Sequence, residues 1–178
     1  MHPVVYASYG GACVTKQVRH RFDQKGALAW GASQYHTWMG DPFPGAVKTF
    51  LVVSRDGSTT PPRMRVNIFE DEEPINLIPG PGPSDERRKP PMGTEIVAAN
   101  YGGQDVTATV RALWAQQGHL NFDTPDARFG DPIPGVVKAL VVTYLTTKNK
   151  TPHRESAFYF DGEHVLIGHY PYPSHQQF

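Results

Sequence analysis

The sequence has a single cysteine, Cys13, among its 178 residues. One cysteine excludes a disulfide within the chain, and it excludes a zinc site built from several thiolates. The chain also lacks any apolar run near the ~20 residues that a membrane-spanning helix needs. Its opening residues, MHPVVYASYGG, do not show the basic head and apolar stretch of a signal peptide. We therefore expect a cytoplasmic protein with no membrane span.

An excess of charge is missing as well, because 17 Lys and Arg residues balance 17 Asp and Glu residues. Proteins that bind nucleic acids or anionic membranes through charge usually carry a basic excess or a basic stripe. The one dense basic group, in ERRKPP at residues 86–91, lies in a proline-rich segment that is typical of an exposed linker. The sequence thus argues against a nucleic-acid partner.

The sequence also lacks the motifs that usually mark a catalytic, metal or cofactor site. It has no GxSxG nucleophile motif, no glycine-rich phosphate loop and no HExxH metal motif. Three of its histidines, His164, His169 and His175, gather near the end beside Asp161 and Glu163, but their spacing matches no strong ligand pattern. We predict no catalytic residue, no metal and no cofactor, and we keep an enzyme with an unrecognised site as an alternative.

Glycine and proline are abundant at 17 residues each, and aromatic residues make up 11% of the chain. This composition favours many turns over long helices. Runs rich in β-branched residues, such as AVKTFLVVS at 46–54 and VVKALVVTYL at 136–145, are typical of central strands. The predicted fold class is mainly β.

The clearest feature that is present is an internal duplication. The segment MGDPFPGAVKTFLVV at residues 39–53 returns as FGDPIPGVVKALVV at residues 129–142. The match extends with an offset of 92 residues from YASYGG at residues 6–11, and the offset becomes 90 after a two-residue insertion in the first copy. The duplication covers residues 5–77 and 97–168.

The duplication divides the chain into a first β repeat at residues 1–77, a Pro/Gly-rich linker at 78–93, a second β repeat at 94–170 and a tail at 171–178. A unit of about 70 residues buries only about 60% of its chain surface and is marginally stable alone. We therefore expect the repeats to pack on each other as a pseudo-twofold pair, with two separate units as the alternative.

Within each repeat the pattern predicts about five strands and one short helix, in a β-sandwich-like arrangement. In DVTATVRALWAQQG the apolar residues recur at helical spacing, with Thr107 as the expected N-cap and Gly118 as the C-terminal stop. The first copy keeps the equivalent threonine and glycine. Asp161-Gly162, between two strand-like runs, predicts a hairpin turn.

The GDPxPG segment has a structural and a functional interpretation. Its prolines fix φ and its glycines permit positive φ, so it could form a rigid corner before a central strand. Asp41 and Asp131 could accept hydrogen bonds from nearby backbone amides, and Lys48 and Lys138 begin the strands that follow. We favour the structural interpretation and keep direct ligand binding as the alternative.

The second repeat resembles the C-terminal domain of a DnaJ-like co-chaperone subfamily, which is also found in stand-alone microbial and fungal proteins. The residues that carry the resemblance are Asp105, Val106, Thr107, Leu120, Gly130, Asp131, Pro132, Gly135, Lys138, Leu140, Val142 and Tyr144. The first copy departs from the pattern, with Ala12-Cys13 before its helix and Ser54-Arg55 in the tyrosine region. A J-domain is missing, and the resemblance implies a β-rich interaction or binding domain without catalytic residues.

The insertion in the first copy is rich in aromatic residues. AWGASQYHTWMGD at 29–41 places Trp30, Tyr35, His36 and Trp38 in a predicted loop. The loop in the second copy is polar instead, with Asn121, Asp123, Asp126 and Arg128. The aromatic rings could pack between the repeats, or they could form a stacking platform for a sugar.

The predicted function is a non-catalytic, lectin-like module that binds a carbohydrate through the aromatic loop of the first repeat. A protein ligand or an assembly role is the alternative, and the chain could also form a homo-oligomer. The predicted ligand-binding residues are Trp30, Tyr35, His36, Trp38, Asp41, Asn121, Asp123 and Arg128.

Overall fold

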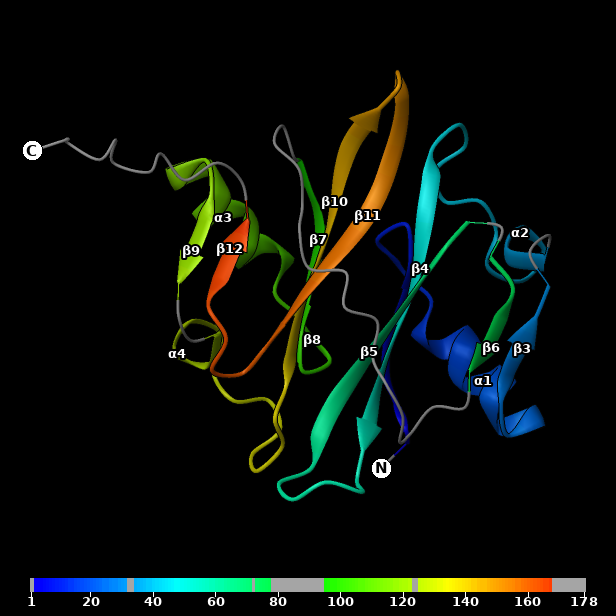
Figure 1. Cartoon of the computed structure of the whole chain (residues 1–178), viewed down its shortest axis with the longest axis horizontal. Coiled ribbons are helices and arrows are strands. Elements are labelled where there is room, and N and C mark those ends of the chain that lie inside the picture. The colour runs from blue at the N-terminus through cyan, green and yellow to red at the C-terminus, as the bar shows by residue number, and fades with distance from the viewer. Residues whose placement is uncertain (1, 32–33, 72, 78–94, 123–124, 168–178) are drawn as a thin grey trace, which may run out of the picture.

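The computed structural model describes residues 2–31, 34–71, 73–77, 95–122 and 125–167. The fold is mainly β, as the sequence predicts (Figure 1). In the described ranges, every helix is too short or too polar to cross a membrane.

The predicted linker at 78–93 and the predicted tail at 171–178 lie outside the described residues.

In the described residues each half of the chain has six strands and two helices, where the sequence predicted about five strands and one helix. The first half contains β1 (Val4–Tyr9), β2 (Ala12–Cys13), α1 (Thr15–Lys25), β3 (Leu28–Trp30), α2 (Tyr35–Met39), β4 (Val47–Asp56), β5 (Arg63–Glu70) and β6 (Ile75–Leu77). The second half contains, in the same order, β7 (Glu95–Tyr101), β8 (Gln104–Asp105), α3 (Thr107–Gln117), β9 (Leu120–Phe122), α4 (Pro125–Phe129), β10 (Ala139–Lys148), β11 (Thr151–Phe160) and β12 (Val165–Ile167). Helices α2 and α4 and strands β2 and β8 are too short to show a periodic pattern in the sequence.

Two three-stranded antiparallel sheets form the middle of the molecule. In the first half β4 pairs with β1 and β5, and in the second half β10 pairs with β7 and β11. A short parallel pairing joins β11 to β4, with His153 opposite Val47. Arg63 and Val137 form a parallel bridge between the start of β5 and the segment before β10. Arg63 lies 90 residues before His153, and Val137 lies 90 residues after Val47, so the bridge joins the equivalent positions of the two repeats. Together with β2 beside β1 and β8 beside β7, the two halves form one curled, eight-stranded sheet (Figure 1).

Both faces of β4 are buried, which explains its unbroken apolar run. Leu51 and Val53 face a central core between the two halves of the sheet, while Phe50 and Val52 face the opposite side. The central core also contains side chains of β5, β10 and β11, so both repeats contribute to it. A fully buried side chain of this kind contributes about 1.5–3 kcal/mol, so the shared core opposes separation of the repeats.

Each sheet is covered on its outer face by a helix and a two-stranded ribbon. Helix α1 and the β3–β6 ribbon cover the first sheet, and helix α3 and the β9–β12 ribbon cover the second. The two covering layers lie at opposite ends of the long axis (Figure 1). Because β12 pairs with β9, the predicted hairpin at Asp161-Gly162 is wrong. The Asp161 carboxylate accepts hydrogen bonds from Tyr101 and Lys138 instead.

The start of the helix in each repeat differs from the prediction, and its end agrees. Val106, and not Thr107, is the N-cap residue of α3. The Thr107 Oγ1 accepts the Ala99 N–H at 2.9 Å and donates to the Ala99 carbonyl at 3.3 Å, so it ties the helix to β7. Gly118 ends the helix with a φ of 67°, and its N–H donates to the Trp114 carbonyl at 2.7 Å. Equivalent bonds occur in the first repeat.

An arginine from each long helix covers the free edge of a neighbouring strand. The pairing of β1 with β4 is irregular at Val5. Arg19 donates from Nε to the Val4 carbonyl at 2.9 Å and from Nη2 to the Val5 carbonyl at 3.0 Å. Arg111 makes the equivalent bonds to β7. Edge strands with unpaired backbone groups tend to pair with other chains, so both arginines have a structural role.

The Tyr-Gly-Gly turn of each repeat packs against the opening strand of the other. Gly11 has a φ of +90°, and a Cβ atom there would lie 2.6 Å from Cγ1 of Val97. Gly103 has a φ of +92°, and a Cβ atom there would lie 2.9 Å from Cγ1 of Val5. These two glycines allow the repeats to approach each other closely.

Replacing Gly11 by Ala should therefore destabilise the protein more than replacing Gly45 by Ala. Both residues have positive φ, +90° and +82°, so each substitution adds about 1–2 kcal/mol of backbone strain. Only the new Cβ at Gly11 meets a neighbour, and overpacking should cost a further ~1–3 kcal/mol. Urea unfolding of both variants gives the difference, and equal losses would contradict the close contact between the repeats.

Candidate functional site

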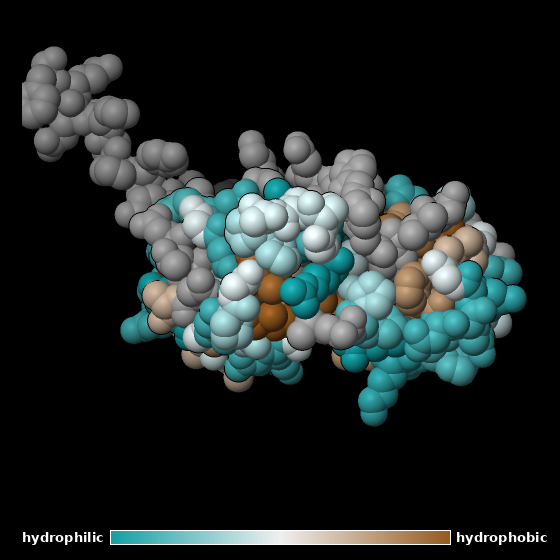
Figure 2. Space-filling view, turned by 90° about the horizontal axis from the view of Figure 1, so that it is seen from below, coloured by the Kyte–Doolittle hydropathy of each residue, from teal (hydrophilic) through white to brown (hydrophobic). Residues whose placement is uncertain are grey.

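A groove of about 540 Å³ lies where the first repeat meets the second. Strands β1 and β2 and the start of α1 form its first wall, and strands β7 and β8 and the start of α3 form its second wall. A recess of about 360 Å³ shares Val5, Arg19 and Gly103 with the groove and includes the half-buried Ile133. From below, hydrophobic surface is exposed near the middle of the molecule, between polar side chains (Figure 2). The groove has the size of a small-molecule site.

The two walls are built from positions that are equivalent in the duplication. Their frame is unchanged, because Gly11 and Gly103 occupy equivalent positions, as do the valines of the opening strands and the threonines that begin the helices. Other positions differ between the two copies. The first copy has Tyr6, Cys13 and Lys16 where the second copy has Ala98, Asp105 and Ala108. The two walls of the groove therefore share a backbone framework but differ in chemistry.

Two groups at the groove have shifted pKa values. Burial raises the pKa of Tyr6 to about 12, although a hydrogen bond with Ser8 acts in the other direction, and the neighbouring Cys13 and Asp105 raise it further. Hydrogen bonds from Thr107 lower the pKa of Asp105 from its ordinary value. At neutral pH the phenol is therefore protonated and the carboxylate is ionised.

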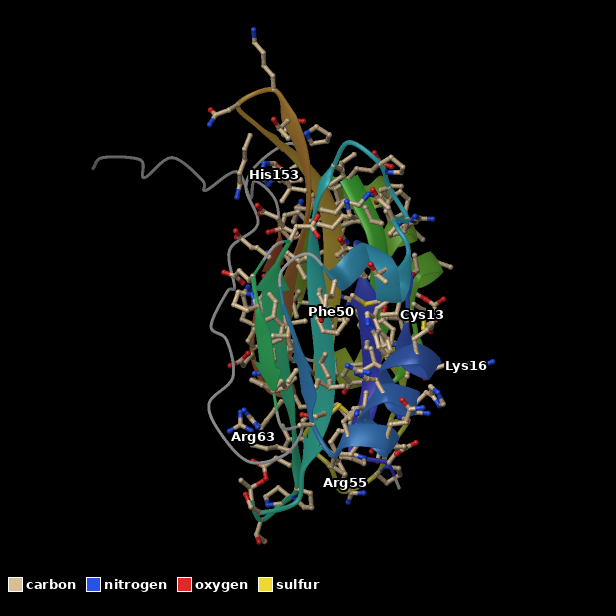
Figure 3. All side chains as sticks on the ribbon, turned by 90° about the vertical axis from the view of Figure 1, so that its right-hand side faces the viewer. Cys13, Lys16, Phe50, Arg55, Arg63 and His153 are labelled. Atoms are coloured by element: carbon tan, nitrogen blue, oxygen red, sulfur yellow. The ribbon has the colours of Figure 1, made fainter. Side chains whose placement is uncertain are left out.

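The first wall carries a thiol and an ammonium group at its rim. Cys13 is exposed, and its Sγ lies 3.3 Å from Oγ1 of Thr15. Lys16 is exposed on the first turn of α1. Figure 3 shows both residues on the same side of the molecule, with the Lys16 side chain extended away from the helix. Cys13 is the one cysteine of the sequence, so a thiol reagent would label this groove alone.

The predicted aromatic loop is folded as part of β3 and the short helix α2. Trp30 lies on β3, and Tyr35 and His36 lie on α2, but the side chains of these three residues are outside the described part of the structure. Trp38 is half-buried, and the Arg21 guanidinium lies 4.0 Å from the centroid of its ring. Trp38 thus contacts α1 of its own repeat, in the outer layer of the molecule.

The structure does not bring the predicted residues of the two repeats together. Asn121 is half-buried on β9, and Arg128 of α4 stacks 4.8 Å from the centroid of Phe122. Strand β9 and helix α4 lie at the opposite end of the long axis from α2 (Figure 1). Asp123 lies outside the described residues. Asn121 and Arg128 therefore do not share a site with the predicted residues of the first loop, and binding by the first loop alone stays a prediction.

The GDPxPG segments form corners around a buried lysine in each repeat. Lys48 is only 2% exposed, and its ammonium lies 3.1 Å from Asp41 and 3.3 Å from Asp71 while donating to the Ala46 carbonyl at 2.6 Å. Asp71 also accepts a hydrogen bond from the Tyr9 hydroxyl. Asp41 accepts a hydrogen bond from a backbone amide two residues ahead, as the sequence predicts.

The second repeat builds the same arrangement around Lys138. This lysine is 3% exposed and lies 3.0 Å from Asp131 and 3.1 Å from Asp161, and Tyr101 donates to Asp161. The contacts of Asp41 and Asp131 lie within the corners, which supports a structural role for both.

The predicted histidine cluster lies largely outside the described part of the chain. His164 is exposed, while His169 and His175 are outside the described residues. Among the residues that are described, no group of three or more His, Cys, Asp or Glu is placed to hold a metal ion.

No family model matches the chain, and no match to it is found among the curated proteins or the solved structures. Sequence reasoning missed Tyr6, Lys16 and Asp105 as site residues. A position-by-position comparison of the repeats could have found them, since they differ between copies whose surrounding frame is the same.

The geometry of the corners predicts different costs for two carboxylates. Asp161 accepts hydrogen bonds from Tyr101 and from Lys138 N and is 16% exposed, whereas Asp131 is 44% exposed. Asp161→Asn should destabilise the protein by about 3 kcal/mol or more, because it removes a carboxylate that neutralises the buried ammonium group of Lys138. Asp131→Asn should cost about 1–2 kcal/mol.

Chemical denaturation of the two variants measures both values. If Asp131→Asn keeps full stability but abolishes ligand binding, the corner is a binding site and its structural interpretation is wrong.

Proposed function

We propose that this protein is a non-catalytic ligand-binding module, and that its ligand is a small polar molecule held in the groove between the two repeats. The observation that carries the proposal is that the two walls of the groove share the residues that shape their backbone but differ in side chains that line the groove. Both copies keep the glycines, valines and threonines that line the walls, but the groove-lining positions of Tyr6, Cys13 and Lys16 differ from their equivalents. Such a difference is expected where a duplicated scaffold acquires one asymmetric site.

The protonation states in the groove favour binding over catalysis. A general acid or base works best with a pKa near the operating pH. The pKa of Tyr6 is raised to about 12, and the pKa of Asp105 is lowered, so both groups move away from neutrality. At neutral pH they serve as a fixed hydrogen-bond donor and a fixed anion, which suits recognition of a polar ligand.

The architecture that we propose for the module is a pseudo-twofold pair of repeats. The equal order of elements supports it, as do the two parallel pairings that join equivalent positions and the reciprocal contacts of Gly11 and Gly103. The groove would then lie beside the approximate axis. We keep the resemblance of the second repeat to the C-terminal domain of the DnaJ-like subfamily as part of this proposal, since that domain also implies a binding role.

The reactivity of Cys13 tests the proposed site. We expect a ligand in the groove to slow the reaction of Cys13 with a maleimide fluorophore, because the thiol lies in the first wall. The protein would be screened against pools of amino acids, sugars, nucleotides and organic acids, and the labelling rate would be followed by fluorescence. A pool that contains the ligand should lower the rate in a saturable manner.

A variant with its cysteine elsewhere provides the control. In the double variant Cys13→Ser, Gln116→Cys, the thiol moves to the exposed end of α3, away from the residues that line the groove. The same pool should leave the labelling rate of this variant unchanged. Equal protection of both thiols, or binding that persists at full affinity after Cys13 has been labelled, would place the ligand elsewhere.

Carbohydrate binding at the aromatic segment is the second candidate function. Trp38 is half-buried, so part of its indole reaches solvent, and the segment is longer than its equivalent by two residues. A sugar that stacks there would change the environment of the indole and leave the labelling of Cys13 unaffected. The two candidates therefore give different results in the same experiment.

A further inference from the structure

We infer that the ligand of the groove is a small zwitterion, a molecule that carries both an ammonium and a carboxylate group, such as an amino acid. This inference rests on the proposed function, because it names the chemical class that the same groove would take. Its basis is the presence of an ammonium group, Lys16, on the first wall of the groove and a carboxylate, Asp105, on the second.

The first wall is positive. Lys16 is exposed at the rim on the first turn of α1, and Arg19 lies one turn further along the helix. The Arg19 guanidinium is held by the Val4 and Val5 carbonyls, so its charge has a fixed position in the wall. Lys16 has a long flexible stem, and its ammonium could approach a bound carboxylate.

The second wall carries the carboxylate of Asp105, with the Arg111 guanidinium nearby. Asp105 accepts the Thr107 N–H at 2.9 Å through Oδ1, which fixes the orientation of its carboxylate at the start of α3. The position equivalent to Lys16 on this wall is Ala108, so the second wall has no matching lysine there. An ammonium group near Asp105 would be attracted by the carboxylate.

Ligands with one charge fit these walls less well. A lone carboxylate near Lys16 faces Asp105 across the groove, and a lone amine near Asp105 faces Lys16 and Arg19. Attraction or repulsion between two charges is stronger in a partly desolvated groove than in bulk water. A zwitterion gains both attractions, and each wall discriminates against the wrong orientation.

The middle of the groove suits a short aliphatic spacer between the two charges. Val97, which packs against Gly11, and Ala98 supply apolar surface there. The Tyr6 phenol, also in the lining, is protonated at neutral pH and could donate a hydrogen bond to a polar group of the ligand.

Titrations with ω-amino acids of increasing length test the inference. The probes are glycine, β-alanine, γ-aminobutyrate and ε-aminocaproate, and amide NMR spectra of the full chain would report the dissociation constant of each. We expect one length to bind best, since the walls fix the spacing of the charges. Butyrate and butylamine, which keep the carbon skeleton of γ-aminobutyrate but only one charge, should each bind about tenfold more weakly than the best zwitterion.

Charge-deleting variants assign each end of the zwitterion to a wall. Lys16→Gln should weaken the zwitterion and the carboxylate probe, and it should not weaken the amine probe. Asp105→Asn should weaken the zwitterion and the amine probe, and its amide oxygen can still accept the Thr107 N–H. Lys25→Gln, on the last turn of the same helix, is the matched control and should change nothing.

The possible results separate this inference from the proposed function. The inferred ligand class is wrong if butyrate or butylamine binds as tightly as every zwitterion. It is also wrong if the Lys16→Gln and Asp105→Asn variants both bind zwitterions with unchanged affinity. If sugars or nucleotides protect Cys13 while no ω-amino acid binds, the groove remains the site and the inferred ligand class is wrong. If no molecule binds in the groove, both proposals fail.

Discussion

A buried ammonium group holds each repeat together, and the rest of the structure depends on it. A lysine that is 2–3% exposed can remain charged only if its partners replace water. Lys48 meets this requirement by joining the GDPxPG corner, through Asp41, to the end of β5, through Asp71. The same aspartate binds the hydroxyl of Tyr9, whose ring lies 5.6 Å from the ammonium. Three segments that are distant in the sequence are thereby held at one point, and the second repeat does the same around Lys138.

The position of the groove follows from this arrangement. Tyr9 is the residue before the Gly-Gly turn, and a Cβ atom on Gly10 would lie 2.9 Å from Cγ of Lys48, so the turn is pressed onto the lysine stem. Gly11 then reaches Val97 of the other repeat, and the reciprocal contact of Gly103 completes the junction. The groove lies beside this junction. The lysines thus fix the backbone of both walls, which leaves exposed side chains such as Lys16 free to differ between the copies without affecting the fold.

Local patterns predicted much of the fold. The apolar run of β4 and the stop at Gly118 depend on neighbouring residues, and the structure contains the strand and the helix end where they were expected. The failures came from longer-range competition. Thr107 binds β7 because an edge strand needs partners, and the turn at Asp161 does not make a hairpin because β12, which follows it, pairs with β9. The groove could not be read from a local pattern, since its walls come from positions 92 residues apart and its key residues look like ordinary surface residues in isolation.

The central claim is that the protein binds a small polar molecule between its repeats. The most direct measurement maps the ligand site without choosing the ligand beforehand, by recording amide NMR spectra of the isotopically labelled protein with pools of amino acids, sugars and organic acids. We expect that, in any pool that binds, the saturable amide shifts cluster on both walls of the groove, at residues such as Thr15, Lys16, Ala98 and Gly103. Saturable shifts that cluster instead around Trp38 and α2, or the absence of saturable shifts at the groove in every pool, would contradict it.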